Sequence, residues 1–184
     1  MVETPANRKE DETIGRVFVI LGTSHDIQWR PKDATPSECK LIDGLDSVIR
    51  ASISKYKIKL IAEETLGPNS PPTVACQIAK EKMMRYVEIE MLPHEAEAAG
   101  IASEVRRLND PTTRDGGNDE SRWRIVDDRR ENSWLDKIQV TMASPVLVVC
   151  GYKHTRSLAT KARDRRCAVA EEVFFPLNLR DKLT

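Results

Sequence analysis

The chain has 184 residues, with 29 basic and 29 acidic side chains, so its formal net charge is zero. This length is enough for one domain with a full hydrophobic core, and the balanced charge gives no general attraction to nucleic acid or to an anionic membrane. Aromatic residues make up only 5% of the chain, which argues against a surface that stacks on bases. We therefore expect a globular protein with no nucleic-acid partner.

The N-terminal region predicts a polar segment ahead of the folded part. Residues 1–15 contain no apolar run, so they fit neither a signal peptide nor a membrane anchor. The rest of the chain has no stretch apolar enough to cross a bilayer, and its four cysteines form no Cys-x-x-Cys pair. We expect a flexible tail at 1–15 and a single α/β domain at 16–184, in a cytoplasmic protein with reduced thiols and no membrane partner.

The first half of the domain predicts strands that alternate with helices. Val17–Leu21 is an unbroken aliphatic run, as a parallel strand covered on both faces requires. Pro36–Tyr56 carries apolar residues close to the i, i+4, i+7 spacing of one buried helix face. Further strands are expected at Ile58–Ala62 and Tyr86–Met91, with a helix at Thr73–Met84 between them.

The second half continues the same alternation. It begins with a short helix closed by Gly100, and residues 108–120, rich in Gly, Pro, Asn and charge, predict a flexible loop that could cover a site. The remaining elements are expected to be helices at 121–139 and 155–166 and strands at 146–150 and 169–175. This order predicts an α/β fold, with a mostly parallel central sheet flanked by helices.

Two Gly-x-x-His motifs follow buried-looking strands. Gly22 to His25 follows the first strand, and Gly151 to His154 follows the strand at 146–150. Because glycine allows a sharp turn and open α/β sheets bind ligands at their carboxyl edge, we expect both histidines to lie at that edge. Glu63 and Glu64 end the second strand at the same edge.

Two histidines and a carboxylate suit a divalent metal ion with an open position for water. The same groups could instead polarise water without a metal, with glutamate as the base. Successive strand residues point to opposite faces, so only one of Glu63 and Glu64 should face the site. We favour Glu63 as the ligand because it directly continues the buried run, which gives His25, Glu63 and His154 as the metal set.

Further residues could support such a site. Arg130 lies on the apolar side of a charged helix, so it needs an anionic partner: a site glutamate, a substrate carboxylate or a developing oxyanion. The alternative is a surface ion pair with Asp127 or Glu131. Asp26 and Gln28 follow the first histidine closely enough to hydrogen-bond to it.

These motifs together resemble the TraB/Tiki/ChaN/erythromycin-esterase superfamily. The resemblance rests on the ordered set Gly22-Thr23-Ser24-His25, Ala62-Glu63-Glu64, Arg130-Glu131-Asn132-Ser133-Trp134 and Val149-Cys150-Gly151-Tyr152-Lys153-His154. It implies an α/β fold whose motifs share one cleft, with His25, Glu63 or Glu64, Arg130 and His154 forming the site. The chain departs from the family patterns in its short length, in Glu131 where Asn or Asp usually follows the arginine, and in lacking a glutamate directly after Gly22.

Members of this superfamily suggest two functions. Tiki-like members are metal-dependent peptidases, so the resemblance implies a hydrolase that uses Zn, Mn, Co or Fe, with Glu63, Glu64 and Arg130 in catalytic roles and a peptide or small molecule as substrate. ChaN-like members bind haem, which implies the alternative of a non-catalytic domain that binds haem or an anionic small molecule, or that regulates a partner. The sequence leaves the oligomeric state open, a homodimer included.

Overall fold

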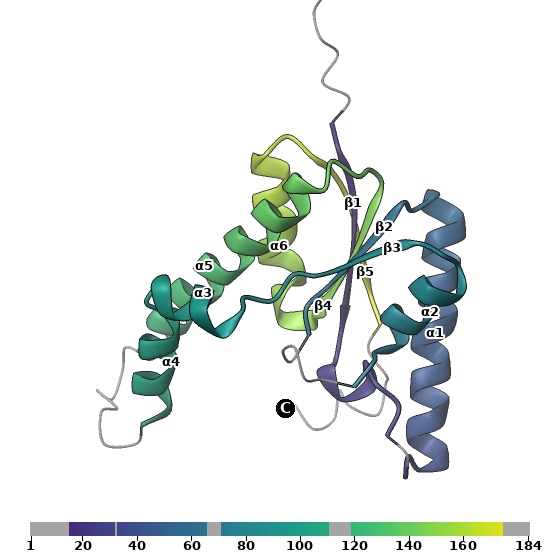
Figure 1. The fold of residues 1–184 in the computed structure, drawn as a ribbon, viewed down its shortest axis with the longest axis horizontal. Coiled ribbons are helices and arrows are strands. Elements are labelled where there is room, and N and C mark those ends of the chain that lie inside the picture. Colours follow the sequence, from purple (N-terminus) through teal and green to yellow (C-terminus); the bar gives the residue numbers. More distant parts are fainter. Residues whose placement is uncertain (1–14, 32, 66–70, 111–118, 175–184) are drawn as a thin grey trace, which may run out of the picture.

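Five strands form one parallel sheet, in the order β3-β2-β4-β1-β5 (Figure 1). This computed structural model describes residues 15–31, 33–65, 71–110 and 119–174. The expected α/β fold, with a parallel central sheet and flanking helices in one domain, is confirmed. In chain order the strands are β1 (Val17–Thr23), β2 (Leu60–Glu63), β3 (Arg85–Glu88), β4 (Val146–Gly151) and β5 (Ala168–Val173).

Six α-helices are described, and five of them match expected helices. The first begins at Pro36 because a capping box precedes it: Thr35 Oγ1 accepts from the backbone N–H of Glu38, and the Glu38 carboxylate accepts from that of Thr35. The helix at 101–109 was not expected. The helices are α1 (Pro36–Tyr56), α2 (Val74–Glu81), α3 (Pro93–Ala98), α4 (Ile101–Asn109), α5 (Asp119–Val140) and α6 (Thr155–Asp164).

The two faces of the sheet are covered by different helices. Val19 and Leu21 of β1 belong to one hydrophobic cluster, together with residues of α1 and α2. Phe18 and Ile20 point to the other face and join residues of α5 and α6. Because both faces are buried, β1 reads in the sequence as a continuous apolar run and not as an alternation.

Helices α3 and α4, with the first half of α5, form an arm that extends away from the sheet (Figure 1). The arm has its own hydrophobic cluster, in which Ile101, Leu108 and Val126 are buried. Residues 108 and 109 belong to α4 and residues 119 and 120 to α5, so the described ends of the expected loop at 108–120 are helical. Residues 111–118 of that loop and residues 1–14 of the expected tail lie outside the described residues.

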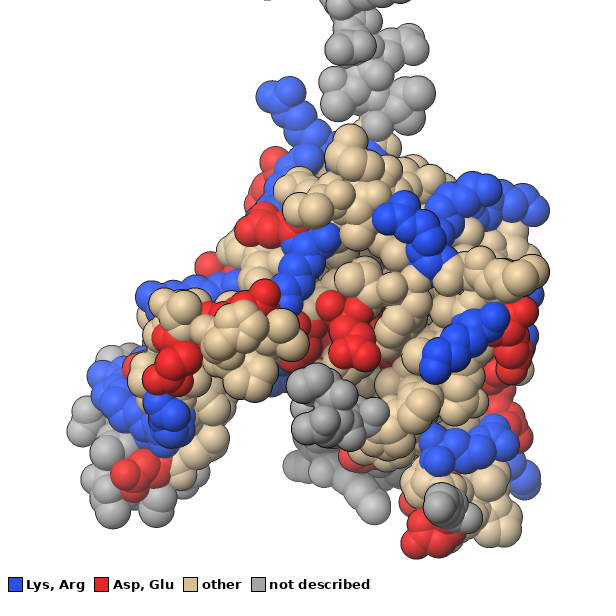
Figure 2. Space-filling view, in the orientation of Figure 1, with Lys and Arg blue, Asp and Glu red and all other residues tan. Residues whose placement is uncertain are grey.

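The surface agrees with the balanced composition. Figure 2 shows basic and acidic side chains interspersed over the face that it draws. Within the described ranges, no helix is both long enough and apolar enough to span a membrane.

Candidate functional site

The two Gly-x-x-His motifs lie side by side at the carboxyl edge of the sheet. β1 and β4 are hydrogen-bonded neighbours, with Gly22 opposite Cys150 and Thr23 opposite Gly151. Each strand leads into a short 3-10 turn that carries the histidine, η1 (His25–Ile27) or η3 (Tyr152–His154). β2 pairs with β4 on its other side, so the three strands that carry the expected site residues are adjacent.

Close packing at this edge disfavours a side chain at both motif glycines, and more severely at Gly22 than at Gly151. A Cβ atom on Gly22 would lie 2.0 Å from Thr155 Oγ1, an impossible overlap. A Cβ atom on Gly151 would lie 3.0 Å from His25 Nε2 and 3.4 Å from Glu64 Oε2. The glycine of the second motif therefore lets a histidine and a carboxylate approach the backbone of β4 from either side.

Glu64 is the centre of the cluster. Its side chain is buried, its Oε2 accepts from the Gly151 backbone N–H at 2.8 Å, and its Oε1 accepts from Arg130 Nη2 at 2.9 Å. The same Oε1 lies 3.5 Å from His25 Nε2 and 3.7 Å from His154 Nε2. Burial by itself would raise the pKa of Glu64, but hydrogen bonding with His25 and the charges of His154, His25 and Arg130 lower it to about 2. Glu64 is thus an anion near neutral pH.

Both histidines direct Nε2 toward that anion. His25 Nδ1 lies 2.8 Å from Gln28 Oε1, and His154 Nδ1 lies 2.8 Å from Glu131 Oε1. An amide oxygen and an ionised carboxylate can only accept, so each Nδ1 donates and each Nε2 is left with a lone pair when the ring is neutral. The expected contact of Gln28 with His25 is present, whereas Asp26 is exposed.

The two imidazoles differ in their environment. His154 is 1% exposed, and its Nε2 has no hydrogen-bond partner among the described residues. His25 is 31% exposed, and the hydrogen bond with Glu64 raises its pKa against the opposing effect of burial. His25 therefore faces solvent, next to a hollow of about 190 Å³ that Ser24, Asp26, Tyr152 and Lys153 also line.

Arg130 connects Glu64 to the arm. Its guanidinium bonds to Glu64 and Glu90, lies 3.4 Å from Asp127 Oδ1, and stacks 5.1 Å from the ring of Trp134. Burial lowers the pKa of Arg130, but the carboxylates, Glu90 first, outweigh it and raise the pKa overall. Arg130 thus pairs with a site glutamate, Glu64, and also with Asp127. The sequence left these two partners as alternatives, and the structure contains both.

The structure places Glu64, and not the expected Glu63, beside the two histidines. Glu63 follows Ile61 toward the α1 and α2 face, where its Oε2 accepts from Thr73 Oγ1 and, at 2.7 Å, from Tyr86 Oη. Glu64 follows Ala62 toward the α5 face. Strand alternation does separate the two carboxylates, but burial of the preceding run does not reveal which face holds the site.

Two further acids were missed as members of the cluster. Glu131 is 1% exposed and accepts from His154 Nδ1, from Ser157 Oγ at 2.7 Å and from Lys161 Nζ at 2.7 Å. Burial raises its pKa, but these three partners lower it overall. Its sequence signal is its place directly after Arg130, from which the sequence predicts only a surface ion pair with that arginine or a departure from the family pattern. Glu90, the other acid, lies beyond β3, where the sequence gives no sign of the arginine that it meets.

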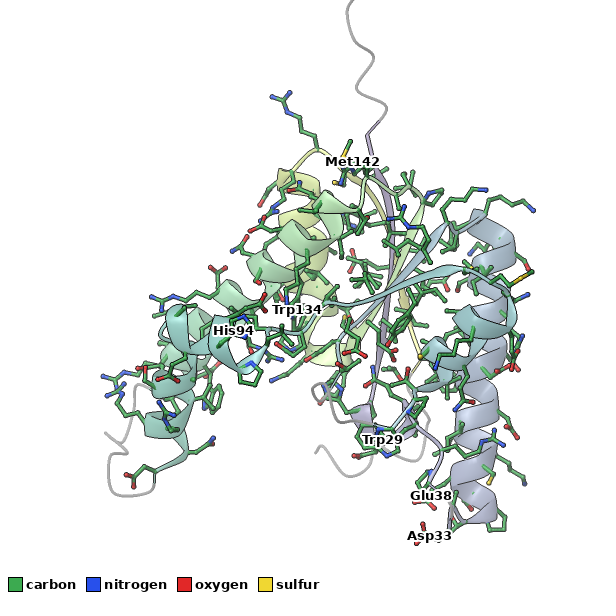
Figure 3. The ribbon with its side chains drawn as sticks, viewed as in Figure 1. Trp29, Asp33, Glu38, His94, Trp134 and Met142 are labelled. Atoms are coloured by element: carbon green, nitrogen blue, oxygen red, sulfur yellow. The ribbon has the colours of Figure 1, made fainter. Side chains whose placement is uncertain are left out.

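Trp134 packs against the cluster from α5. It is fully buried between that helix and the sheet (Figure 3), and its ring meets the ring of His154 edge-on at 5.0 Å. Through its contacts with both side chains, the tryptophan holds His154 and Arg130 in place.

His94, unlike the two motif histidines, is an exposed residue of α3 in the arm.

The donor atoms suit a divalent ion in kind, and the Glu64 oxygen lies at a plausible ligand-to-ligand distance from each histidine nitrogen. Two ligands of one tetrahedral zinc ion lie about 3.4 Å apart when each is about 2.1 Å from the metal. Glu64 Oε1 lies 3.5 and 3.7 Å from the two histidine Nε2 atoms, close to this separation. Over the described ranges, no three His, Cys, Asp or Glu side chains meet the full set of spacings for a preformed metal site.

Comparison of this chain with protein-family models, with curated proteins and with solved structures found no match.

Proposed function

We propose that this protein is a metal-dependent hydrolase that holds a divalent ion, such as Zn, Mn, Co or Fe, with His25, His154 and Glu64. The observation that carries the proposal is the orientation of the two imidazoles. Each Nδ1 is engaged by an oxygen acceptor, and each Nε2 faces the same Glu64 oxygen. Metal-ligating histidines are typically held in this way through their other ring nitrogen.

Electrostatics supports a cation at this point. Lone pairs on two nitrogens that face a carboxylate oxygen repel one another unless a positive charge lies between them. A proton on His25 Nε2 would relieve the repulsion between this nitrogen and Glu64, and contact with Glu64 favours that proton because it raises the pKa of His25. The buried Nε2 of His154 would still lack a partner within the described part of the chain, and a metal ion would satisfy all three groups together.

The resemblance to the TraB/Tiki/ChaN/erythromycin-esterase superfamily supports the same proposal, because its Tiki-like members are metal-dependent peptidases. We accordingly propose an amide or peptide substrate. When bound, the ion would supply Lewis-acid chemistry by polarising the scissile carbonyl and lowering the pKa of water.

The protein residues would prepare the site for this chemistry. Gln28 and Glu131 fix the tautomers of the two histidines, so that each Nε2 is available as a ligand. The Gly151 N–H holds the Glu64 carboxylate in position. Arg130, held against Trp134, donates to Glu64 Oε1 and helps to keep this carboxylate ionised and in position beside the histidines.

Elemental analysis of the purified protein tests the metal site directly. We expect near-stoichiometric metal in the wild type and its loss in the double variant His25→Ala/His154→Ala. The exposed His94 provides a matched control, and His94→Ala should keep the metal. Wild-type protein that holds no ion after each metal is added back, or a double variant that retains it tightly, would contradict the proposal.

Hydrolysis of a panel of amides and esters by the metal-loaded protein tests the reaction. Glu64→Gln should abolish turnover, whereas Glu63→Gln, which alters the neighbouring carboxylate on the other face of the sheet, should retain it. The non-catalytic alternative predicts a different result: no metal, no turnover, and a Soret band when haem is added.

A further inference from the structure

The arm contains a second, apolar hollow. It has a volume of about 320 Å³ and lies between the α3–α4 pair and α5. Pockets for small ligands typically begin at about 300 Å³ and are lined mainly by apolar side chains. Most of this lining is apolar and comprises Met91, Ile101, Ala102, Val105, Trp123 and Val126.

The hollow and the candidate site share one side chain, Arg130. Arg130 and Glu90 also line it. Arg130 Nη2 donates at 2.9 Å to Glu64 Oε1, the oxygen that both histidines face. A group bound in the hollow could therefore contact the same Arg130 guanidinium that bonds to Glu64 at the proposed reaction centre.

The charges at this end of the hollow select the kind of group that fits. Arg130 is surrounded by three carboxylates, those of Glu64, Glu90 and Asp127. Its positive charge is thus already engaged, and an anionic ligand at this position would have to compete with these carboxylates for the guanidinium. The apolar walls in turn favour a group with no charge, because a buried charge without a partner is costly.

We infer that this hollow binds a large apolar side chain of the substrate, such as leucine or phenylalanine, on the residue whose amide bond is cleaved. The inference rests on the proposed hydrolase function and adds a substrate class to it. Because a single methylene in a hydrophobic pocket changes kcat/KM by about 10–200-fold, the preference over alanine should be about 10-fold or more.

Hydrolysis of neutral acetyl-Xaa-p-nitroanilides by the metal-loaded protein tests the preference. We expect kcat/KM for Leu and Phe to exceed that for Ala by about 10-fold or more, and Asp to be the poorest substrate. Ala102→Trp should fill the hollow and remove most of the advantage of Phe, and the milder Ala102→Leu should remove part of it. Val140→Trp introduces the same side chain at an 83%-exposed position of α5 and should keep the full preference.

A binding measurement separates this inference from the hydrolase proposal. In protein labelled with 5-fluorotryptophan, acetyl-phenylalanine amide should shift the 19F resonance of Trp123, which lines the hollow, and leave that of Trp29 in place. Trp123→Phe assigns the resonance. A shift that Ala102→Leu weakens, in a protein without turnover, would support the pocket and overturn the hydrolase proposal. Turnover with equal rates for Ala, Leu and Phe and no Trp123 shift would overturn the pocket alone.

Discussion

Gly22→Ala should destabilise the protein, because β1 meets the turn that follows β4 at this residue. The added Cβ would lie 2.0 Å from Thr155 Oγ1 and 3.0 Å from the Cα of Tyr152, against an optimum of about 3.5–4.0 Å for carbon contacts. Gly22 pairs with Cys150 on one side and Val173 on the other, so the backbone has little room to retreat. Overpacking of this kind costs about 1–3 kcal/mol, and we expect a value near the upper end.

Urea unfolding of a double-mutant cycle with Thr155→Ala tests this reasoning. Thr155→Ala alone loses a 2.9 Å hydrogen bond to the Tyr152 carbonyl, a cost of about 1 kcal/mol. In the double variant the nearest overlap is absent, so its destabilisation should be smaller than the sum of the two single changes by at least about 1 kcal/mol. Additivity within about 0.5 kcal/mol, or a Gly22→Ala variant as stable as the wild type, would refute the steric explanation.

Three further predictions concern the acids and the second glycine. Burial raises the pKa of Glu63 to about 7 against its bonds from Thr73 and Tyr86, so wild-type stability should fall as pH rises from about 4.5 to 7. Glu63→Gln should remove that fall, so that at pH 8 its free energy of unfolding in urea exceeds the value expected from the wild-type pH dependence by up to about 3 kcal/mol. Wild-type and variant stabilities that change with pH in parallel would contradict this prediction. Glu131→Gln should weaken metal binding about 10–100-fold by titration calorimetry; an unchanged Kd would exclude its role in holding His154. Gly151→Ala should also lower metal affinity while leaving the unfolding midpoint nearly unchanged, because His25 is partly exposed and can move outward; a large loss of stability would show that it cannot.

Local pattern was sufficient for most of the fold. The helix expected at 36–56 has those bounds in the structure, because a proline after a capping threonine marks its start and its apolar face is regular. The β1 and β4 runs were recognisable because strands covered on both faces are continuously apolar. Helix α4 was not predicted because it packs in the arm, where Ile101 and Leu108 are its only buried residues and most of the remaining positions are polar or charged.

Tertiary contacts decided what the sequence left open at the site. The meeting of His25 with His154 follows from motif position once the strands are parallel. The choice between Glu63 and Glu64 depends on which helices cover each face, and nothing within β2 specifies that. The roles of Glu131 and Glu90 depend on how α5 lies across the sheet, a long-range packing arrangement with no short-range signature.

The placement of the site has a consequence for folding. Its groups come from residues 25, 64, 130 and 154, and they meet only after β1 has paired with β4 across more than a hundred residues of intervening chain. Contacts between such distant segments form late and give slow folding. The assembled cluster could be followed during refolding through the spectrum of a bound ion such as Co²⁺. The rate at which that signal appears would then report when the sheet is completed. A fragment that lacks either terminal third of the chain should not produce the signal.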